Sequence, residues 1–200
     1  MDENKDVRLA NPDLVEWLEQ HRVATLGTTR SLEKGPSSPL ITAAGMELAW
    51  WWLWTRGAPA KQTAFNARSE NLVGSPLWRE PFRSGRVLIP ASYYFEMANV
   101  PGAVGRFRFE IPGLAMFAIA GIASPIGLDG YPRLSFAMVT REPTADTALV
   151  HDRMPLLIPP SMYDEWLDPE RPGDDALVRS TVTASEELAR QLTHVKVQAR

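Results

Sequence analysis

Short strand-like segments separated by turn residues fill the middle of this chain, from Leu40 to Thr140. Residues 106–111 alternate polar and apolar side chains, which is typical of a strand with one buried face. Residues 115–123 are apolar throughout and predict a fully buried strand. Further strands are predicted at residues 40–42, 47–55, 86–90, 92–98 and 133–140. Because no internal repeat or linker interrupts the chain, we expect one α+β domain with a mostly antiparallel sheet core.

Helices are predicted toward the two ends of the chain. The Asn-Pro-Asp start at Asn11 is typical of a helix cap, and His21 is expected at the edge of the apolar face that follows. Pro160 begins a predicted short helix that buries Trp166. Two closing helices are expected at residues 174–182 and 185–192, and a helical turn is expected at 146–150. Residues 31–39 and most of 58–81 are predicted to be loops.

Composition indicates an ordinary soluble, cytoplasmic protein. The 200 residues suit one domain, and 44% of them are hydrophobic. The longest apolar stretch, near residues 48–54, is too short to cross a bilayer. The polar residues 1–6 do not resemble a signal peptide, and we expect them to form a flexible extension. With 3 histidines and no cysteine, the sequence predicts no disulfide, no metal site and no cofactor.

The charge of the chain is unevenly distributed. The net charge is -3, yet residues 56–108 hold eight basic residues against three acidic ones, which is +5 locally and leaves -8 for the remainder. Seven of those eight basic residues are arginines, and arginine suits contact with phosphate. The alternative is a solvated face that only helps solubility.

Several short polar motifs interrupt the apolar segments. They are Asn-Ala-Arg-Ser-Glu at residues 66–70, Pro-Phe-Arg at 81–83, the stretch 86–96, Thr140 to Asp146, and His-Asp-Arg-Met-Pro at 151–155. Together they supply an amide, a guanidinium, a carboxylate and an imidazole beside apolar strands. A small proton-transfer site needs this set of groups.

Each of these polar residues also has a purely structural interpretation. Glu96 follows aromatic residues, and an apolar setting raises a carboxyl pKa toward the range useful for proton transfer. The alternative is a buried glutamate paired with an arginine. His151 suits acid–base chemistry, or it is a hydrogen-bonded structural histidine. Asn66 and Arg68 are candidate site residues that alternatively hold a loop in place.

Arg153 and the tryptophan-rich run are the remaining candidates. Arg153 is expected to be a structural ion-pair partner rather than a DNA contact. Four tryptophans, at positions 50, 51, 52 and 54, offer a surface on which bases can stack. The alternative is that alternate members of the run belong to the core.

In this order and at these distances, the motifs resemble the SRAP family of SOS-response-associated peptidases, which act as abasic-site-processing proteins. The resemblance covers residues 8–170 and includes the helix with Trp166. It implies an SRAP-like fold with a barrel-like core and a role in the DNA damage response. It also implies that the partner is single-stranded DNA, with or without abasic sites.

The resemblance also implies a role for each motif residue. In the family, a cysteine directly after the initiator methionine reacts with the abasic aldehyde: its amine forms a Schiff base and its thiol closes a thiazolidine ring. By motif position, Asn66 orients the amino terminus, Glu96 moves protons and His151 helps to open the sugar ring. Arg68 holds a flanking phosphate. The other DNA contacts that we expect are Arg83, Arg86 and Trp52.

The chain departs from the family pattern where the nucleophile belongs. Asp6 occupies the cysteine position, five residues precede it, and a carboxylate cannot form a thiazolidine. Asp2 disfavours removal of Met1, so self-processing is not expected. Residues 35–39 lack the family's asparagine, and residues 52–56 lack its glycine and proline. Residues 194–198 barely match the family's closing segment, so His194 is expected to be an ordinary tail residue.

Three functions follow from this mixture of kept and lost positions. The favoured one is an SRAP-like protein that binds single-stranded or abasic DNA without thiazolidine cross-linking. The second is a cysteine-independent enzyme in which an amine, from Met1 or Lys5, forms a reversible Schiff base and promotes strand cleavage. The third is a non-catalytic partner-binding protein that keeps only the fold.

Overall fold

The computed structural model describes residues 37–197, apart from residues 57, 61–63, 130–131 and 145. The helix predicted from Asn11, His21 and the predicted extension of residues 1–6 lie outside the described residues. Of the predicted loop 31–39, only residues 37–39 are described. They begin a strand instead, because their backbone pairs with residues 48–50.

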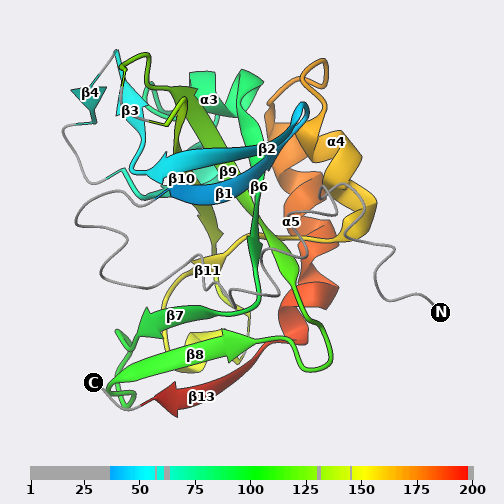
Figure 1. The fold of residues 1–200 in the computed structure, drawn as a ribbon. Coiled ribbons are helices and arrows are strands. Elements are labelled where there is room, and N and C mark those ends of the chain that lie inside the picture. Colours follow the sequence, from blue (N-terminus) through cyan, green and yellow to red (C-terminus); the bar gives the residue numbers. More distant parts are fainter. Residues whose placement is uncertain (1–36, 57, 61–63, 130–131, 145, 198–200) are drawn as a thin grey trace.

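A small barrel forms the centre of the fold (Figure 1). Its strands are β1 (Ser37–Thr42), β2 (Gly45–Trp51), β6 (Arg86–Ala91), β9 (Phe117–Pro125) and β10 (Leu134–Arg141). They pair in the order β10-β2-β1-β6-β9, and β9 pairs back onto β10, so the ring closes. The pairing is antiparallel except between β10 and β2. The predicted α+β fold with a mostly antiparallel, barrel-like core is confirmed.

Short strands extend this barrel. β5 (Asn66–Arg68) runs parallel to β10, β11 (Met154–Pro155) pairs with the end of β10, and β12 (Leu157–Ile158) pairs with β9. A separate pair consists of β3 (Trp54–Thr55) and β4 (Ala58–Pro59). The parallel pairing of β5 with β10 fixes the Asn66–Arg68 motif on the sheet.

The central strands are buried on both faces. In β6, Val87 and Ile89 belong to one apolar cluster, whereas Leu88 belongs to a second cluster on the opposite face. The second cluster also contains Phe82 and Trp166 from the helices. Removing both faces of the strands from water supplies most of the driving force for folding, which explains their near-continuous apolar sequence.

Helices cover one side of the barrel (Figure 1). They are α3 (Arg79–Ser84), α4 (Tyr163–Leu167) and α5 (Asp175–Arg190), with the 3-10 turns η1 (Ser69–Asn71), η2 (Thr147–Leu149) and η3 (Pro160–Met162). Trp166 is fully buried, and its Nε1–H donates a hydrogen bond of 3.0 Å to the Val87 carbonyl. The predicted short helix after Pro160 is thus confirmed. None of the helices in the described ranges is long and apolar enough to span a membrane.

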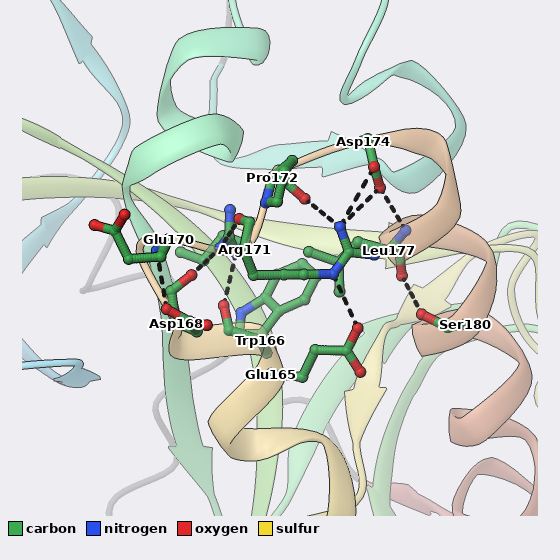
Figure 2. Close-up of polar contacts among 10 residues, drawn as sticks. Glu165, Trp166, Asp168, Glu170, Arg171, Pro172, Asp174, Leu177 and Ser180 are labelled. Carbon is green, nitrogen blue, oxygen red and sulfur yellow. Dashed lines mark hydrogen bonds and ion pairs between the residues drawn. The ribbon is translucent and has the colours of Figure 1, made fainter.

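The loop between α4 and α5 is held by Arg171 (Figure 2). Its Nε–H donates to Glu165 of α4 at 3.1 Å, and its Nη1–H donates to Asp174 at 3.3 Å. Asp174 is also the N-cap of α5, because its carboxylate accepts a hydrogen bond from the Leu177 N–H at 2.8 Å. This capping lowers the pKa of Asp174, and the Arg171 guanidinium lowers it further. The network fixes where α5 begins relative to α4.

A second, three-stranded sheet lies at one end of the barrel (Figure 1). Its order is β13-β8-β7, with β7 (Tyr94–Met97), β8 (Arg106–Glu110) and β13 (Thr193–Val197). Tyr94 stacks on Phe109 with ring centroids 4.9 Å apart, and the His194 ring lies 5.4 Å from Phe109. The prediction that His194 is an ordinary tail residue is therefore wrong. The closing strand brings it into the sheet.

Three other predicted boundaries also change. The strand predicted at 47–55 ends at Trp51, and the chain turns before β3. Residues 66–68, predicted to be loop, form β5. The two predicted closing helices are one, α5, because packing against the sheet outweighs the weak helix preference of the Thr- and Val-rich centre. Thr181 and Ser185 are fully buried there, and Ser185 Oγ accepts a hydrogen bond from Arg141 at 2.6 Å.

Candidate functional site

The Asn66–Arg68 motif lies on the outside of the barrel. In β5, Ala67 is buried against the sheet while Asn66 and Arg68 are exposed. The register places Asn66 beside Met138 and Arg68 beside Thr140 of β10. The Phe65 carbonyl fixes the approach to β5, because it accepts hydrogen bonds from the Met138 N–H and the Trp51 indole N–H. Within the described residues, neither exposed side chain has a hydrogen-bond or ion-pair partner.

Glu96 and His151 meet although 55 positions separate them in the sequence. His151 Nε2 lies 3.7 Å from Glu96 Oε2, and both side chains are mostly buried, at 21% and 23% exposure. Burial raises the pKa of Glu96; nearby His151 partly opposes the shift and Asp152 adds to it. A carboxyl with a raised pKa beside an imidazole can hold or release a proton at mild pH, as general acid–base chemistry requires.

The other imidazole nitrogen of His151 faces the backbone of Arg153. Nδ1 lies 3.0 Å from the Arg153 nitrogen and 2.9 Å from its carbonyl oxygen. A neutral ring accepts from the Arg153 N–H at Nδ1 and keeps its proton on Nε2, toward Glu96. Because the Arg153 N–H is directed at Nδ1, the backbone of this loop fixes that tautomer and the orientation of the ring.

Asn99 holds the loop that carries His151. Its side-chain N–H donates to Asp152 Oδ1 at 2.6 Å, its side-chain oxygen accepts from the Asp152 N–H at 2.9 Å, and its backbone N–H donates to the Val150 carbonyl. The hydrogen bond from Asn99 lowers the pKa of Asp152. Asp152 Oδ1 also lies 3.4 Å from His151 Nδ1. Sequence reasoning missed Asn99, since nothing in a lone asparagine reveals a partner 53 positions away.

An ion pair joins the same loop to η1, which directly follows β5. Arg153 donates two hydrogen bonds to the Glu70 carboxylate, at 2.8 and 2.9 Å, and a third to the Thr140 carbonyl. Burial raises the pKa of Glu70, but the hydrogen bond and charge of Arg153, together with hydrogen bonds from the Glu70 backbone and Ser69, leave that pKa lowered. The predicted structural ion-pair role of Arg153 is confirmed. Because Thr140 lies beside Arg68, this pair places the His151 loop next to the β5 motif.

The tryptophan run divides between the core and the surface. Trp51 and Trp54 are buried, whereas Trp50 and Trp52 are half-buried. Trp52 packs its ring 4.8 Å from Phe65, the residue that precedes β5, and donates to the Ala60 carbonyl. The half-exposed ring of Trp52 therefore adjoins the Asn66–Arg68 motif. The predicted core position is confirmed for Trp51, and base stacking by Trp52 stays a prediction.

The two other predicted DNA-contacting arginines behave differently. Arg83 is exposed on α3 and, among the described residues, its side chain pairs with Glu80 alone, at 3.1 Å. Arg86 is 5% exposed, and its guanidinium donates to the backbone carbonyls of five residues at 2.5–2.9 Å. Those residues are Phe82, Arg83, Trp166, Asp168 and Arg171. The structure does not favour the predicted DNA contact of Arg86, because its donors already bind the C-terminal carbonyls of α3 and α4.

No metal centre accompanies these residues in the described part of the chain. There, no group of three or more His, Asp or Glu side chains is placed to hold an ion. What the structure does show is a carboxyl–imidazole contact between Glu96 and His151, and two exposed polar side chains, Asn66 and Arg68, on β5.

Comparison with curated proteins finds relatives that share one name. The chain is 29% identical to the abasic site processing protein YoaM of Bacillus subtilis over 126 residues, which are 62% of this chain and 56% of that protein. It is also 29% identical to the abasic site processing protein YMR114C of Saccharomyces cerevisiae, over 70% of this chain and 36% of the yeast protein. The chain thus spans about half the length of the Bacillus subtilis relatives that it matches.

Solved structures share the fold. A protein from Bacteroides thetaiotaomicron superposes with a TM-score of 0.66 at 20% identity, over 82% of this chain and 74% of that one. A phage-related protein from Bordetella bronchiseptica gives a TM-score of 0.63 at 24% identity, over 82% of this chain and 79% of that one. The model of one family, described as SOS response associated peptidase (SRAP), matches residues 7–200. On this match, which spans nearly all of the sequence and agrees with the resemblance of its motifs, the chain belongs to the SRAP family.

Proposed function

We propose that this protein binds single-stranded DNA at abasic sites, on the surface formed by β5, Glu96 and His151. The observation that carries the proposal is the Glu96–His151 pair, 3.7 Å apart and mostly buried, within a family whose named relatives process abasic sites. An abasic site exposes a sugar aldehyde in equilibrium with its closed ring. Opening that ring requires a proton donor and a proton acceptor, and this pair supplies both.

The surroundings of the pair suit a DNA backbone. Arg68 presents an exposed guanidinium next to the loop of His151, and Asn66 lies two residues before it on the same strand face. The half-buried ring of Trp52, packed on Phe65, offers a stacking surface beside them. Arg83 adds an exposed positive charge on α3, whereas Arg153 is occupied by Glu70 and contributes rigidity. A single-stranded segment that lacks one base suits such a site.

The chemistry available without a thiol is narrower than that of the family pattern. None of the 200 residues is cysteine, so no residue of this sequence can close a thiazolidine. Binding without a permanent cross-link is therefore the favoured activity.

A second candidate is a Schiff-base enzyme, which the raised pKa of Glu96 favours. In it, a deprotonated amine attacks the aldehyde carbon and forms a C–N bond. The aldehyde oxygen takes one proton from that amine and one from the Glu96 carboxyl, and it departs as water. The resulting iminium is resolved when a base removes a C2′ proton and the 3′ phosphate leaves, which breaks the strand.

One experiment separates these activities. A fluorescent single-stranded oligonucleotide, with or without one abasic site, is titrated with the protein at two salt concentrations, and the same samples are then treated with borohydride. Salt-sensitive, abasic-selective binding without an adduct supports the favoured function. A trapped adduct establishes the Schiff-base enzyme, because borohydride reduces the imine to a stable amine. Equal, weak binding of every oligonucleotide at both salts would refute both activities.

Site variants locate the activity on the pair. Glu96→Gln and His151→Asn keep the size of each side chain while removing the titrating group, so we expect each to lose abasic selectivity. Glu187→Gln removes an exposed carboxylate on α5 and is the matched control. If the control loses selectivity as much as the site variants, the assignment to Glu96 and His151 is wrong.

A further inference from the structure

The three-stranded sheet has a second face that the candidate site does not use. Successive residues of a strand point to opposite faces, so Phe95 lies on the face of β7 opposite Glu96. Cross-strand pairing adds Arg108 beside Phe95, Arg106 beside Met97, and Val195 beside Arg108. We call this the outer face, defined by Tyr93, Phe95, Met97, Arg106, Arg108 and Val195.

Aromatic rings and guanidinium groups alternate along the outer face. The Arg106 guanidinium carbon lies 3.8 Å from the centroid of the Phe95 ring, and that of Arg108 lies 5.6 Å from the Tyr93 ring. The rings of Tyr93 and Phe95 meet edge to face at 5.3 Å. Each arginine therefore leans diagonally over the aromatic residue of the neighbouring strand, where the ring quadrupole attracts its charge.

The outer face is open to solvent. Met97 is 61% exposed and Val195 is 47% exposed, and Phe95 is half-buried beside them. Exposed side chains of this kind, aromatic rings, methionine and arginine together, are enriched where proteins bind partners. A stacked guanidinium also loses little freedom when a ligand binds, because the ring below already holds it in one orientation.

We propose that the outer face is a second contact surface for single-stranded nucleic acid, on which bases stack on the aromatic and guanidinium planes of β7 and β8. The proposal rests on the proposed function for its ligand and extends it beyond the abasic nucleotide. β7 links the two surfaces, because it carries Glu96 on one face and Phe95 on the other and forms one edge of its sheet.

Charge favours a nucleic acid over a protein as the occupant. The face carries two arginines, and Glu110 of β8 pairs with Arg108 at 3.1 Å. Bases supply planar apolar surfaces that any guanidinium or aromatic ring can stack, and phosphates supply the negative charge. The contact that we propose is therefore tolerant of sequence and sensitive to salt.

The test removes the two arginine charges of the outer face and compares the effect with the removal of two arginine charges elsewhere on the surface. Arg106→Gln/Arg108→Gln is compared with Arg133→Gln/Arg190→Gln, whose arginines are exposed and pair with Glu47 and Glu186 outside this sheet. Anisotropy measures binding to oligonucleotides of 5 and 15 nucleotides with a central abasic site, and circular dichroism checks folding. Only the longer strand extends beyond the candidate site onto the outer face.

We expect the outer-face variant to bind the 15-nucleotide strand about tenfold more weakly than the control variant, from the loss of stacking. Its salt slope should also fall by roughly 1.4, from two lost phosphate contacts. The 5-nucleotide strand should bind both variants alike. In the wild-type protein, strands that carry 5-iodouracil should cross-link to Tyr93 or Phe95 on irradiation.

The outcomes for the two proposals differ. If both double variants bind with equal affinity and equal salt slope, and abasic selectivity is kept, the outer-face proposal is wrong while the proposed function stands. This result is expected if a protein, and not a nucleic acid, binds the outer face. Loss of binding in the outer-face variant, with no abasic preference in the wild type, would support the outer face and overturn the proposed function. Absence of cross-links at Tyr93 and Phe95 would count against the outer face even if the variant proved unfolded.

Discussion

Arg86 provides the sharpest test of how this fold is held together. Its guanidinium is buried and donates to the carbonyls at the ends of α3 and α4 and in the loop before α5. The hydrogen bonds to the Phe82 and Trp166 carbonyls are buried, so Arg86→Met would leave these two carbonyls without that donor while nearly keeping the side-chain volume. A buried carbonyl left without a donor costs about 1–3 kcal/mol, so we expect a loss of roughly 4 kcal/mol from the two together.

The expected loss is measurable as a melting temperature. For a domain of this size, each kcal/mol shifts the melting temperature by roughly 2–4 °C, so Arg86→Met should lower it by at least about 8 °C. Arg83→Met is the matched control, because the Arg83 side chain is 68% exposed and forms an ion pair with Glu80 on the surface of α3. It should stay within about 0.5 kcal/mol of the wild type. If the two variants have the same melting temperature, Arg86 does not anchor the helices, and the prediction that it contacts DNA is again the better explanation of this residue.

Three further predictions concern the site. Asn99→Leu should raise the pKa of Asp152 toward its ordinary value, because the hydrogen bond that lowers it is lost; carbon NMR titration of that carboxyl measures this, and an unchanged pKa would exclude Asn99 as its cause. Glu96 has a folded-state pKa above its unfolded value, so its stabilising contribution is present below about pH 4.5 and is lost as the pH rises through the folded pKa. Chemical denaturation should therefore show Glu96→Gln gaining stability over wild type from pH 4 to pH 7, and a constant difference would contradict this. Glu70 has the opposite sign, so its contribution is present above about pH 4.5 and lost as the pH falls through the lowered folded pKa. Glu70→Gln should cost about 0.5–1 kcal/mol at pH 7 and nothing at pH 2, and an equal cost at both pH values would rule out the ion pair with Arg153 as the reason.

Local pattern was enough to predict most strands and the character of the core. The apolar run at 115–123 and the alternation at 106–111 became β9 and β8, since these periods depend only on which face of a strand is buried. The predicted boundaries of elements were wrong where a segment distant in the sequence determines them. Residues 66–68 are a strand because β10 offers a free backbone edge, and α5 continues through its β-branched centre because Arg141 and the sheet hold it there.

The order and spacing of the motifs were sufficient to identify the family, and they singled out Glu96 and His151 as the proton-transfer candidates. Which candidates face solvent became clear from the fold. Arg68 and Arg86 look alike as residues of polar motifs, yet one guanidinium points outward from β5 and the other caps two helices. Asn99 acquired a role only because β7 ends beside the loop of His151. The charge and hydrogen-bonding groups of a side chain follow from its residue type. The partner that these groups bind depends on which segments the fold brings together.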